Sequence, residues 1–200
     1  MSRASQTVLW IGGWAIPAAW GLSRVRERFP DMTHQWRVPG PDALLGAEGF
    51  DHLAGYSLGA SLLLRAGLGE RALLLAPFTD FKKESDQGGQ VSGTQLRHVR
   101  RWLVRDAQCA LNDFYGRAGL DLHASELPYD WDALDWGLDQ LMADVPASCA
   151  AGCTAIVGGE DPLLNPSGLV PYFLKIQQME GVGHALSELL QAMQGTHEIF

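Results

Sequence analysis

The sequence predicts an α/β protein with about six mostly parallel strands, and three observations carry that prediction. Short apolar runs of strand length recur along the chain and end in Gly or Pro. Several are apolar throughout, as strands covered on both faces of a parallel sheet are. Segments of helical character alternate with them, which favours right-handed crossovers and a doubly wound sheet. Two hundred residues suit one domain with a substantial core.

Strand and helix candidates alternate through both ends of the chain. The first strand, residues 7–11, is followed by a pair of glycines, and the helix predicted at residues 18–29 stops at Pro30. The other predicted strands are residues 34–38, 51–56, 71–76, 154–157 and 172–176, and the other helices are residues 62–68 and 185–193.

Residues 81–146 interrupt this alternation between the fourth and fifth strands. We predict an almost wholly helical insertion there, forming a cap, with residues 1–80 and 147–200 as the core. Apolar residues recur every three or four positions between residues 95 and 114, as on one face of a helix. A later helix is predicted at residues 131–142.

The net charge of −8 argues against a nucleic-acid-binding protein, but the charge is uneven. Residues 82–117 hold seven Lys or Arg against four Asp or Glu, so this stretch carries +3. It is either a docking surface for an acidic partner or an ordinary solvated helix face. Its arginines at three- and four-residue spacing are Arg97, Arg100, Arg101 and Arg105.

Several classes of protein are disfavoured. No apolar run reaches about 18 residues, so no membrane span is expected. The first seven residues are polar and lack the layout of a secretory signal, so we expect a cytoplasmic protein. Cys109, Cys149 and Cys153 have no metal-type spacing, and we expect three buried thiols. We expect neither a metal nor an organic cofactor.

The segment Gly-Tyr-Ser-Leu-Gly at residues 55–59 follows the third strand and precedes a helix-forming run. This context is that of a nucleophile elbow, in which a serine sits on a sharp strand-to-helix turn. The residues two before and two after that serine have no room for a Cβ atom, which requires glycine at both positions. Ser57 is therefore the candidate nucleophile.

A serine hydroxyl near neutral pH needs a base to take its proton and a carboxylate to hold that base. Asp161 follows the fifth strand and His184 follows the sixth, in glycine-containing loops at the carboxyl edge of the predicted sheet. Glu160 and Asp80 are the alternative acids. The remaining histidines are His34 and His52, which we interpret as structural, His98 and His123 in the insertion, and His197 near the C-terminus.

The tetrahedral intermediate of ester cleavage needs two N–H donors aimed at its oxyanion. We expect the backbone N–H groups of Leu58, at the start of the elbow helix, and of Trp14, in the loop after the first strand. The Trp14 indole would wall the acyl pocket. Trp102, Phe114 and Tyr115 either complete an apolar channel for substrate or simply pack between helices.

With these residues in place, the chain resembles the α/β-hydrolases, and among them the pimeloyl-acyl-carrier-protein methyl ester esterases of biotin synthesis. The oxyanion loop and the elbow are similar to those of the superfamily, and two patterns in the insertion are similar to those of the esterases. The matching segments are residues 13–16 with Trp20, 55–59, 113–119, 134–144, 159–162 and 183–185.

This resemblance implies a cytoplasmic serine carboxylesterase with the triad Ser57, Asp161 and His184, and an oxyanion hole at Trp14 and Leu58. It also implies that the four arginines dock an acidic acyl-carrier protein carrying the substrate. We expect the usual N-terminal hairpin to be missing, and Gly12 stands where relatives carry His. The alternatives are a thioesterase or general small-ester hydrolase with the same triad, and a non-catalytic binding protein with this fold.

Overall fold

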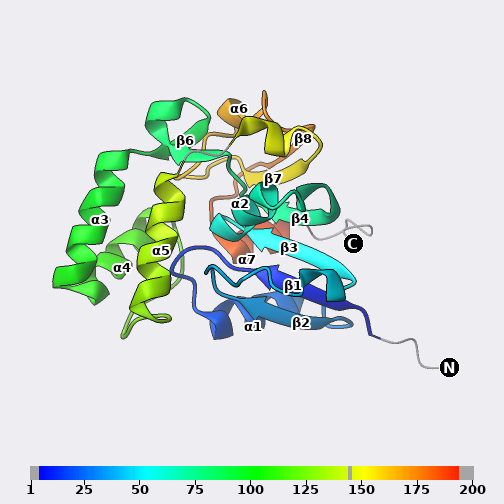
Figure 1. The fold of residues 1–200 in the computed structure, drawn as a ribbon, viewed down its shortest axis with the longest axis horizontal. Helices are drawn as coiled ribbons and strands as arrows, with labels where there is room; N and C mark the ends of the chain where they lie inside the picture. Colours follow the sequence, from blue (N-terminus) through cyan, green and yellow to red (C-terminus); the bar gives the residue numbers. More distant parts are fainter. Residues whose placement is uncertain (1–4, 144–145, 194–200) are drawn as a thin grey trace.

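A computed structural model describes residues 5–143 and 146–193 of the protein. Its main feature is a six-stranded sheet with the order β2-β1-β3-β4-β7-β8, in which every neighbouring pair is parallel (Figure 1). The α/β class and the parallel sheet predicted from the apolar runs are thus confirmed. The strands are β1 Thr7–Ile11, β2 Thr33–Arg37, β3 His52–Tyr56, β4 Ala72–Leu75, β7 Thr154–Gly158 and β8 Lys175–Met179.

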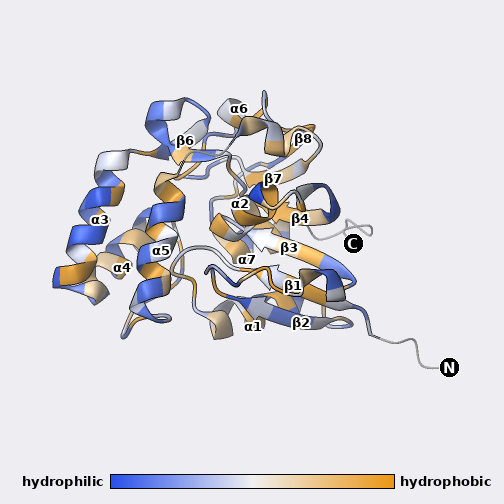
Figure 2. Ribbon diagram, viewed as in Figure 1, coloured by the Kyte–Doolittle hydropathy of each residue, from blue (hydrophilic) through white to orange (hydrophobic). Residues whose placement is uncertain are grey.

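The crossover helices cover the sheet. The helices α1 (Ala18–Arg28) and α7 (Leu186–Ala192) pack against each other, and α2 (Leu58–Arg65) packs on β3 and β4. The short α6 (Pro166–Leu169) leads into β8. Strands β1 and β3 are almost completely buried, which explains their continuous apolar sequence. Figure 2 shows hydrophobic residues along β1 and β3, whereas β2 at the edge of the sheet is mostly hydrophilic.

Three helices of the insertion gather on one side of the molecule, beyond the ends toward which the strands point (Figure 1). They are α3 (Gly93–Arg105), α4 (Ala107–Arg117) and α5 (Trp131–Met142). The last of them lies against α2 and α3. This arrangement places helical surface next to the loops at the carboxyl edge of the sheet.

The insertion differs from the prediction in two ways. It is not almost wholly helical, because it opens with a small parallel pair, β5 (Asp80–Lys82) and β6 (Gly88–Val91). The predicted helix across residues 95–114 is two helices, since the backbone of Asp106 is extended at φ −156° and its side chain caps α4 by accepting from the Cys109 N–H.

Other predicted boundaries also shift. The sixth strand begins at Lys175 rather than residue 172, because the chain turns where the Tyr172 N–H donates to the Leu169 carbonyl. The helix predicted to run to residue 68 ends at Arg65. The expectation of three buried thiols is wrong: all three cysteines are free, but only Cys153 is buried, Cys149 is half-buried and Cys109 is exposed.

None of the helices in the described ranges combines the length and apolar character that a bilayer crossing requires.

Candidate active site

Ser57 occupies the sharp turn between β3 and α2. Its backbone has φ 53° and ψ −116°, a conformation that a residue with a side chain seldom adopts. A Cβ atom on Gly59 would lie 2.0 Å from the carbonyl oxygen of Ile11, and one on Gly55 would lie 2.5 Å from Cα of Ala60. The two glycines are therefore required by close backbone approach, as the elbow motif predicts.

Three side chains from three loops form one hydrogen-bonded chain. The Ser57 Oγ lies 3.0 Å from Nε2 of His184, and Nδ1 of His184 lies 2.7 Å from Oδ2 of Asp161. All three residues are buried, with exposed fractions of 7%, 2% and 4% for Ser57, His184 and Asp161. With Nδ1–H donating to the carboxylate, Nε2 presents its lone pair to the serine hydroxyl.

The carboxylate of Asp161 is oriented by its own loop. Its Oδ1 accepts from the backbone N–H groups of Leu163 at 2.8 Å and Leu164 at 3.0 Å. This leaves Oδ2 for the imidazole. The two oxygens therefore have separate partners, and the side chain cannot rotate away without losing both N–H bonds.

The loop that carries His184 is held by two residues that sequence reasoning missed. The hydroxyl of Tyr56 donates to the His184 carbonyl at 3.0 Å, and its ring centroid lies 5.5 Å from the imidazole. The Glu188 carboxylate accepts from the N–H of Gly183 at 2.7 Å. Tyr56 is the residue before the candidate nucleophile, so its position in the elbow was the signal that could have indicated this role.

The alternative acids do not reach the imidazole. Asp80 is buried, but its carboxylate pairs with Lys82, 3.4 Å from the ammonium and 2.8 Å from the backbone N–H. Glu160 is exposed. The acid beside His184 is Asp161.

The other histidines lie elsewhere. His34 is a core residue, since its Nδ1 accepts from the indole of Trp10 at 3.1 Å and its Nε2 lies 2.8 Å from the Phe29 carbonyl. Burial lowers the pKa of His34. His98 and His123 are exposed, His52 opens β3, and His197 lies outside the described residues.

The two predicted oxyanion donors are available. Within the described residues, the backbone N–H groups of Trp14 and Leu58 donate to no protein acceptor. Leu58 begins α2, where a helix leaves its N–H groups free and its dipole favours negative charge. The neighbouring N–H of Ala15 is occupied, because it donates to the hydroxyl of Tyr129 at 2.6 Å.

A cavity of about 540 Å³ lies between the insertion and the core. Its wall is mainly apolar, and it reaches the candidate site at Trp14 and Leu163, while Ser57 and His184 do not line it. Arg101 from α3 and Arg117 from α4 are among its polar lining residues. The apolar side chains are Trp14, Phe81, Val91, Leu96, Val99, Phe114, Leu138, Leu141, Pro162 and Leu163.

The three aromatic residues predicted to line a channel have different positions. Phe114 lines the cavity and meets the Trp14 indole edge-on, with ring centroids 4.7 Å apart. Trp102 instead borders an outer groove with Arg105. Tyr115 is buried outside the cavity lining, with its hydroxyl on the Ala15 carbonyl.

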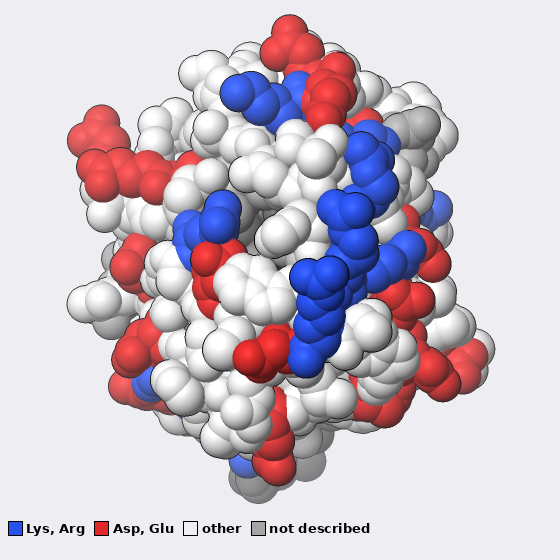
Figure 3. All heavy atoms as spheres, turned by 90° about the vertical axis from the view of Figure 1, so that its left-hand side faces the viewer, with Lys and Arg blue, Asp and Glu red and all other residues white. Residues whose placement is uncertain are grey.

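The four predicted arginines all lie on α3, but they differ in exposure and in their contacts. Arg97, Arg101 and Arg105 are exposed on α3, and Figure 3 shows a band of Lys and Arg side chains beside a hollow on this side of the molecule. Arg100 instead pairs with Asp135 at 2.7 Å and Asp139 at 2.5 Å on α5. It therefore joins two helices and is not free for a partner.

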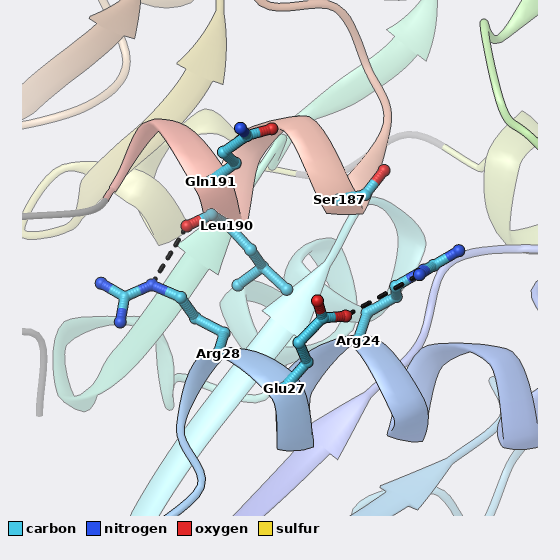
Figure 4. Close-up of a pocket in the computed structure, with 6 residues that line it drawn as sticks. All are labelled: Arg24, Glu27, Arg28, Ser187, Leu190 and Gln191. Carbon is cyan, nitrogen blue, oxygen red and sulfur yellow. Dashed lines mark hydrogen bonds and ion pairs between the residues drawn. The ribbon is translucent and has the colours of Figure 1, made fainter.

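A second groove lies between α1 and α7 (Figure 4). Arg24 pairs with Glu27 at 3.8 Å, and Arg28 donates to the carbonyls of Leu190 and Met193. Because these charged groups bind one another and the end of α7, we assign the groove no chemistry. The described residues also contain no group of three or more His, Cys, Asp or Glu side chains placed to hold a metal ion.

No protein-family model and no curated protein match the sequence. Solved structures do match its fold. They include a hydrolase from Oleispira antarctica (TM-score 0.62, 14% identity, 97% of this chain and 88% of that one) and N-formylmaleamic acid deformylase from Pseudomonas putida (0.59, 15%, 90% and 86%). A thermophilic esterase from Thermogutta terrifontis is a third (0.56, 13%, 94% and 85%). These likenesses confirm the α/β-hydrolase fold.

Proposed function

We propose that the protein is a serine ester hydrolase that works through an acyl-Ser57 intermediate. One observation carries the proposal: the buried chain of hydrogen bonds that joins Ser57 to His184 and His184 to Asp161. Two solved structures with this fold, one named as an esterase and one as a hydrolase, give further support. A strained serine backbone at an elbow also supports it, since such strain persists where function requires it.

The geometry supports an acyl-transfer sequence in two halves. Ser57 Oγ attacks the ester carbonyl while Nε2 of His184 takes its proton, and the Asp161 carboxylate stabilises the imidazolium. The N–H groups of Leu58 and Trp14 stabilise the oxyanion. The C–O bond then breaks, and the alcohol leaves with the proton from His184. A water molecule repeats the cycle on the acyl-serine and releases the carboxylic acid and free Ser57.

For the substrate, we propose the methyl ester of a pimeloyl chain carried on an acidic acyl-carrier protein in biotin precursor synthesis. The apolar cavity beside Trp14 supports an acyl substrate. Exposed Arg97, Arg101 and Arg105 on an otherwise acidic chain support an acidic partner. The resemblance of the insertion to these esterases motivates the specific ester.

The first experiment tests the nucleophile. Ser57→Ala should lower the kcat for a short p-nitrophenyl ester by at least about 10⁴-fold and abolish labelling by a fluorophosphonate, because the triad acts as a unit. Ser187→Ala, in the groove between α1 and α7, is the matched control and should keep both. Undiminished hydrolysis by Ser57→Ala would refute the mechanism, and an unlabelled wild type would favour a binding protein.

The second experiment tests the substrate. The carrier-bound methyl ester, the matching thioester and the free methyl ester are compared as substrates. Reversal of Arg97 and Arg105 to Glu should raise KM for carrier-bound substrate alone, because both arginines are exposed and neither lines the cavity. Reversal of Arg71 and Lys175, both exposed and outside the insertion, is the control with the same change in net charge. An equal rise in KM for the free ester would refute carrier docking, and faster thioester turnover would favour a thioesterase.

A further inference from the structure

In the loop after β1, Ala15 has a backbone conformation that alanine seldom adopts. Ala15 has φ 60°, in the left-handed region, and its side chain is completely buried. Residues with a Cβ atom adopt this region rarely, and mostly where surrounding contacts hold them. The contacts that hold Ala15 therefore bear on the neighbouring Trp14 N–H, the proposed oxyanion donor.

Two tyrosines of the insertion bind both backbone polar groups of Ala15. The Ala15 N–H donates to the hydroxyl oxygen of Tyr129 at 2.6 Å, and the hydroxyl of Tyr115 donates to the Ala15 carbonyl at 2.6 Å. Burial raises the pKa of Tyr115 to about 12 and that of Tyr129 further still. Both hydroxyls are thus protonated near neutral pH and keep these bonds.

The Trp14 side chain is attached to the same insertion. Its indole N–H donates to the Leu134 carbonyl on α5 at 2.9 Å, and its ring meets Phe114 of α4 edge-on. A Cβ atom on Gly137 would lie 2.5 Å from Cδ1 of Trp14, so α5 lies directly against the indole. Residues 14 and 15 are therefore held by α4, α5 and the segment between them.

These bonds give two neighbouring N–H groups of the loop different roles. Tyr129 occupies the Ala15 N–H, whereas the Trp14 N–H has no acceptor among the described residues. We propose that Tyr115 and Tyr129 are positioning residues, which fix the Ala15 backbone so that the Trp14 N–H stays aimed at the oxyanion formed at Ser57. This inference rests on the proposed ester hydrolysis. It adds a requirement that the insertion orient the oxyanion hole as well as enclose substrate.

The kinetic test uses Tyr115→Phe and Tyr129→Phe, which keep the rings and remove the hydroxyls. Tyr172→Phe is the control, because its hydroxyl makes no hydrogen bond to any described residue. With active sites titrated by fluorophosphonate, each tested variant should lose about 10-fold in kcat per active site, less than deletion of an oxyanion donor. KM for a short ester should change by less than about 2-fold, since the acyl pocket is untouched.

A purely structural role would lower the unfolding midpoint and the fraction of titratable sites but leave kcat per active site unchanged, which would overturn the inference. A wild type that neither hydrolyses esters nor labels would instead refute the proposed function.

Amide hydrogen exchange provides a readout without substrate. The Ala15 amide should be protected in the wild type and in Tyr115→Phe, whose lost bond is to the carbonyl. It should exchange faster in Tyr129→Phe, which removes its acceptor. An Ala15 amide that exchanges freely in the wild type would overturn the inference, whatever the kinetics.

Discussion

Replacing Asp161 by Asn exchanges one carboxylate oxygen for an NH₂ group. The proton of the neutral His184 imidazole should then move from Nδ1 to Nε2. The side-chain amide of Asn has one acceptor oxygen. In the wild type, Oδ1 of Asp161 accepts from two buried backbone N–H groups, those of Leu163 at 2.8 Å and Leu164 at 3.0 Å. If the NH₂ group took that place, both N–H groups would lose their acceptor, at about 1–3 kcal/mol each. The NH₂ group should therefore take the Oδ2 position, 2.7 Å from Nδ1 of His184.

An NH₂ group there donates to Nδ1, so the neutral imidazole must carry its proton on Nε2. An N–H at Nε2 cannot accept the proton of Ser57, and the base is lost while the packing is kept. The same exchange in a serine triad lowers kcat about 10⁴-fold, which corresponds to about 5.4 kcal/mol at 1.36 kcal/mol per tenfold. We expect a loss of that order in Asp161→Asn, with KM nearly unchanged.

The assay is hydrolysis of a short p-nitrophenyl ester, with the unfolding midpoint measured on the same samples. Asp80→Asn is the matched control, since Asp80 is also a buried carboxylate but pairs with Lys82. It should lose stability and keep kcat within about 3-fold. If Asp161→Asn retained more than about a tenth of the kcat while Asp80→Asn did not, the acid would be misassigned.

Two further predictions concern stability. Gly59→Ala should lower the free energy of unfolding in denaturant by about 3 kcal/mol, because the new Cβ would lie 2.0 Å from the Ile11 carbonyl oxygen. The control Gly116→Ala, in open space on α4, should raise it by about 0.5–1 kcal/mol. Equal stabilities of the two variants would contradict the close approach at Gly59. His34 has a lowered pKa in the folded protein and accepts from Trp10 through Nδ1, so the unfolded state binds the proton more readily. Stability should therefore fall as pH drops below 6.5, and His34→Gln should flatten this dependence; a wild-type stability that rises on acidification would refute the assignment.

The parts of the fold that could be predicted are those with local or positional causes. Buried parallel strands need apolar residues on both faces, so β1, β3 and β4 appear as short apolar runs. The ends of parallel strands meet at one edge of the sheet, so loops after β7 and β8 could be expected to bring Asp161 and His184 to Ser57. That step required only strand order along the chain.

The parts that could not be predicted depend on contacts between distant segments. The pair β5 and β6 contains Gly88 and Gly89 and lacks the pattern of a strand, and a Cβ atom on Gly89 would lie 2.2 Å from the Phe81 carbonyl. The break at Asp106 did have a signal, since an Asp before a helix start is a preferred N-cap. The apolar spacing continues through that residue, so periodicity alone predicted one helix.

The tyrosines around Ala15 show why a site can be recognised before its support is. Ser57, His184 and Asp161 belong to motifs whose chemistry specifies residue type and order. Tyr115 and Tyr129 lie 100 and 114 residues from Ala15. The sequence offered Tyr115 as a candidate for the substrate channel and gave Tyr129 no role, and it connected neither with the loop after β1. Any hydroxyl that reached the Ala15 backbone would serve. The requirement therefore fixes a position in space and leaves no motif of fixed spacing in the sequence. The loop that carries the proposed oxyanion donor thus depends on an insertion whose sequence gives no local sign of that contact.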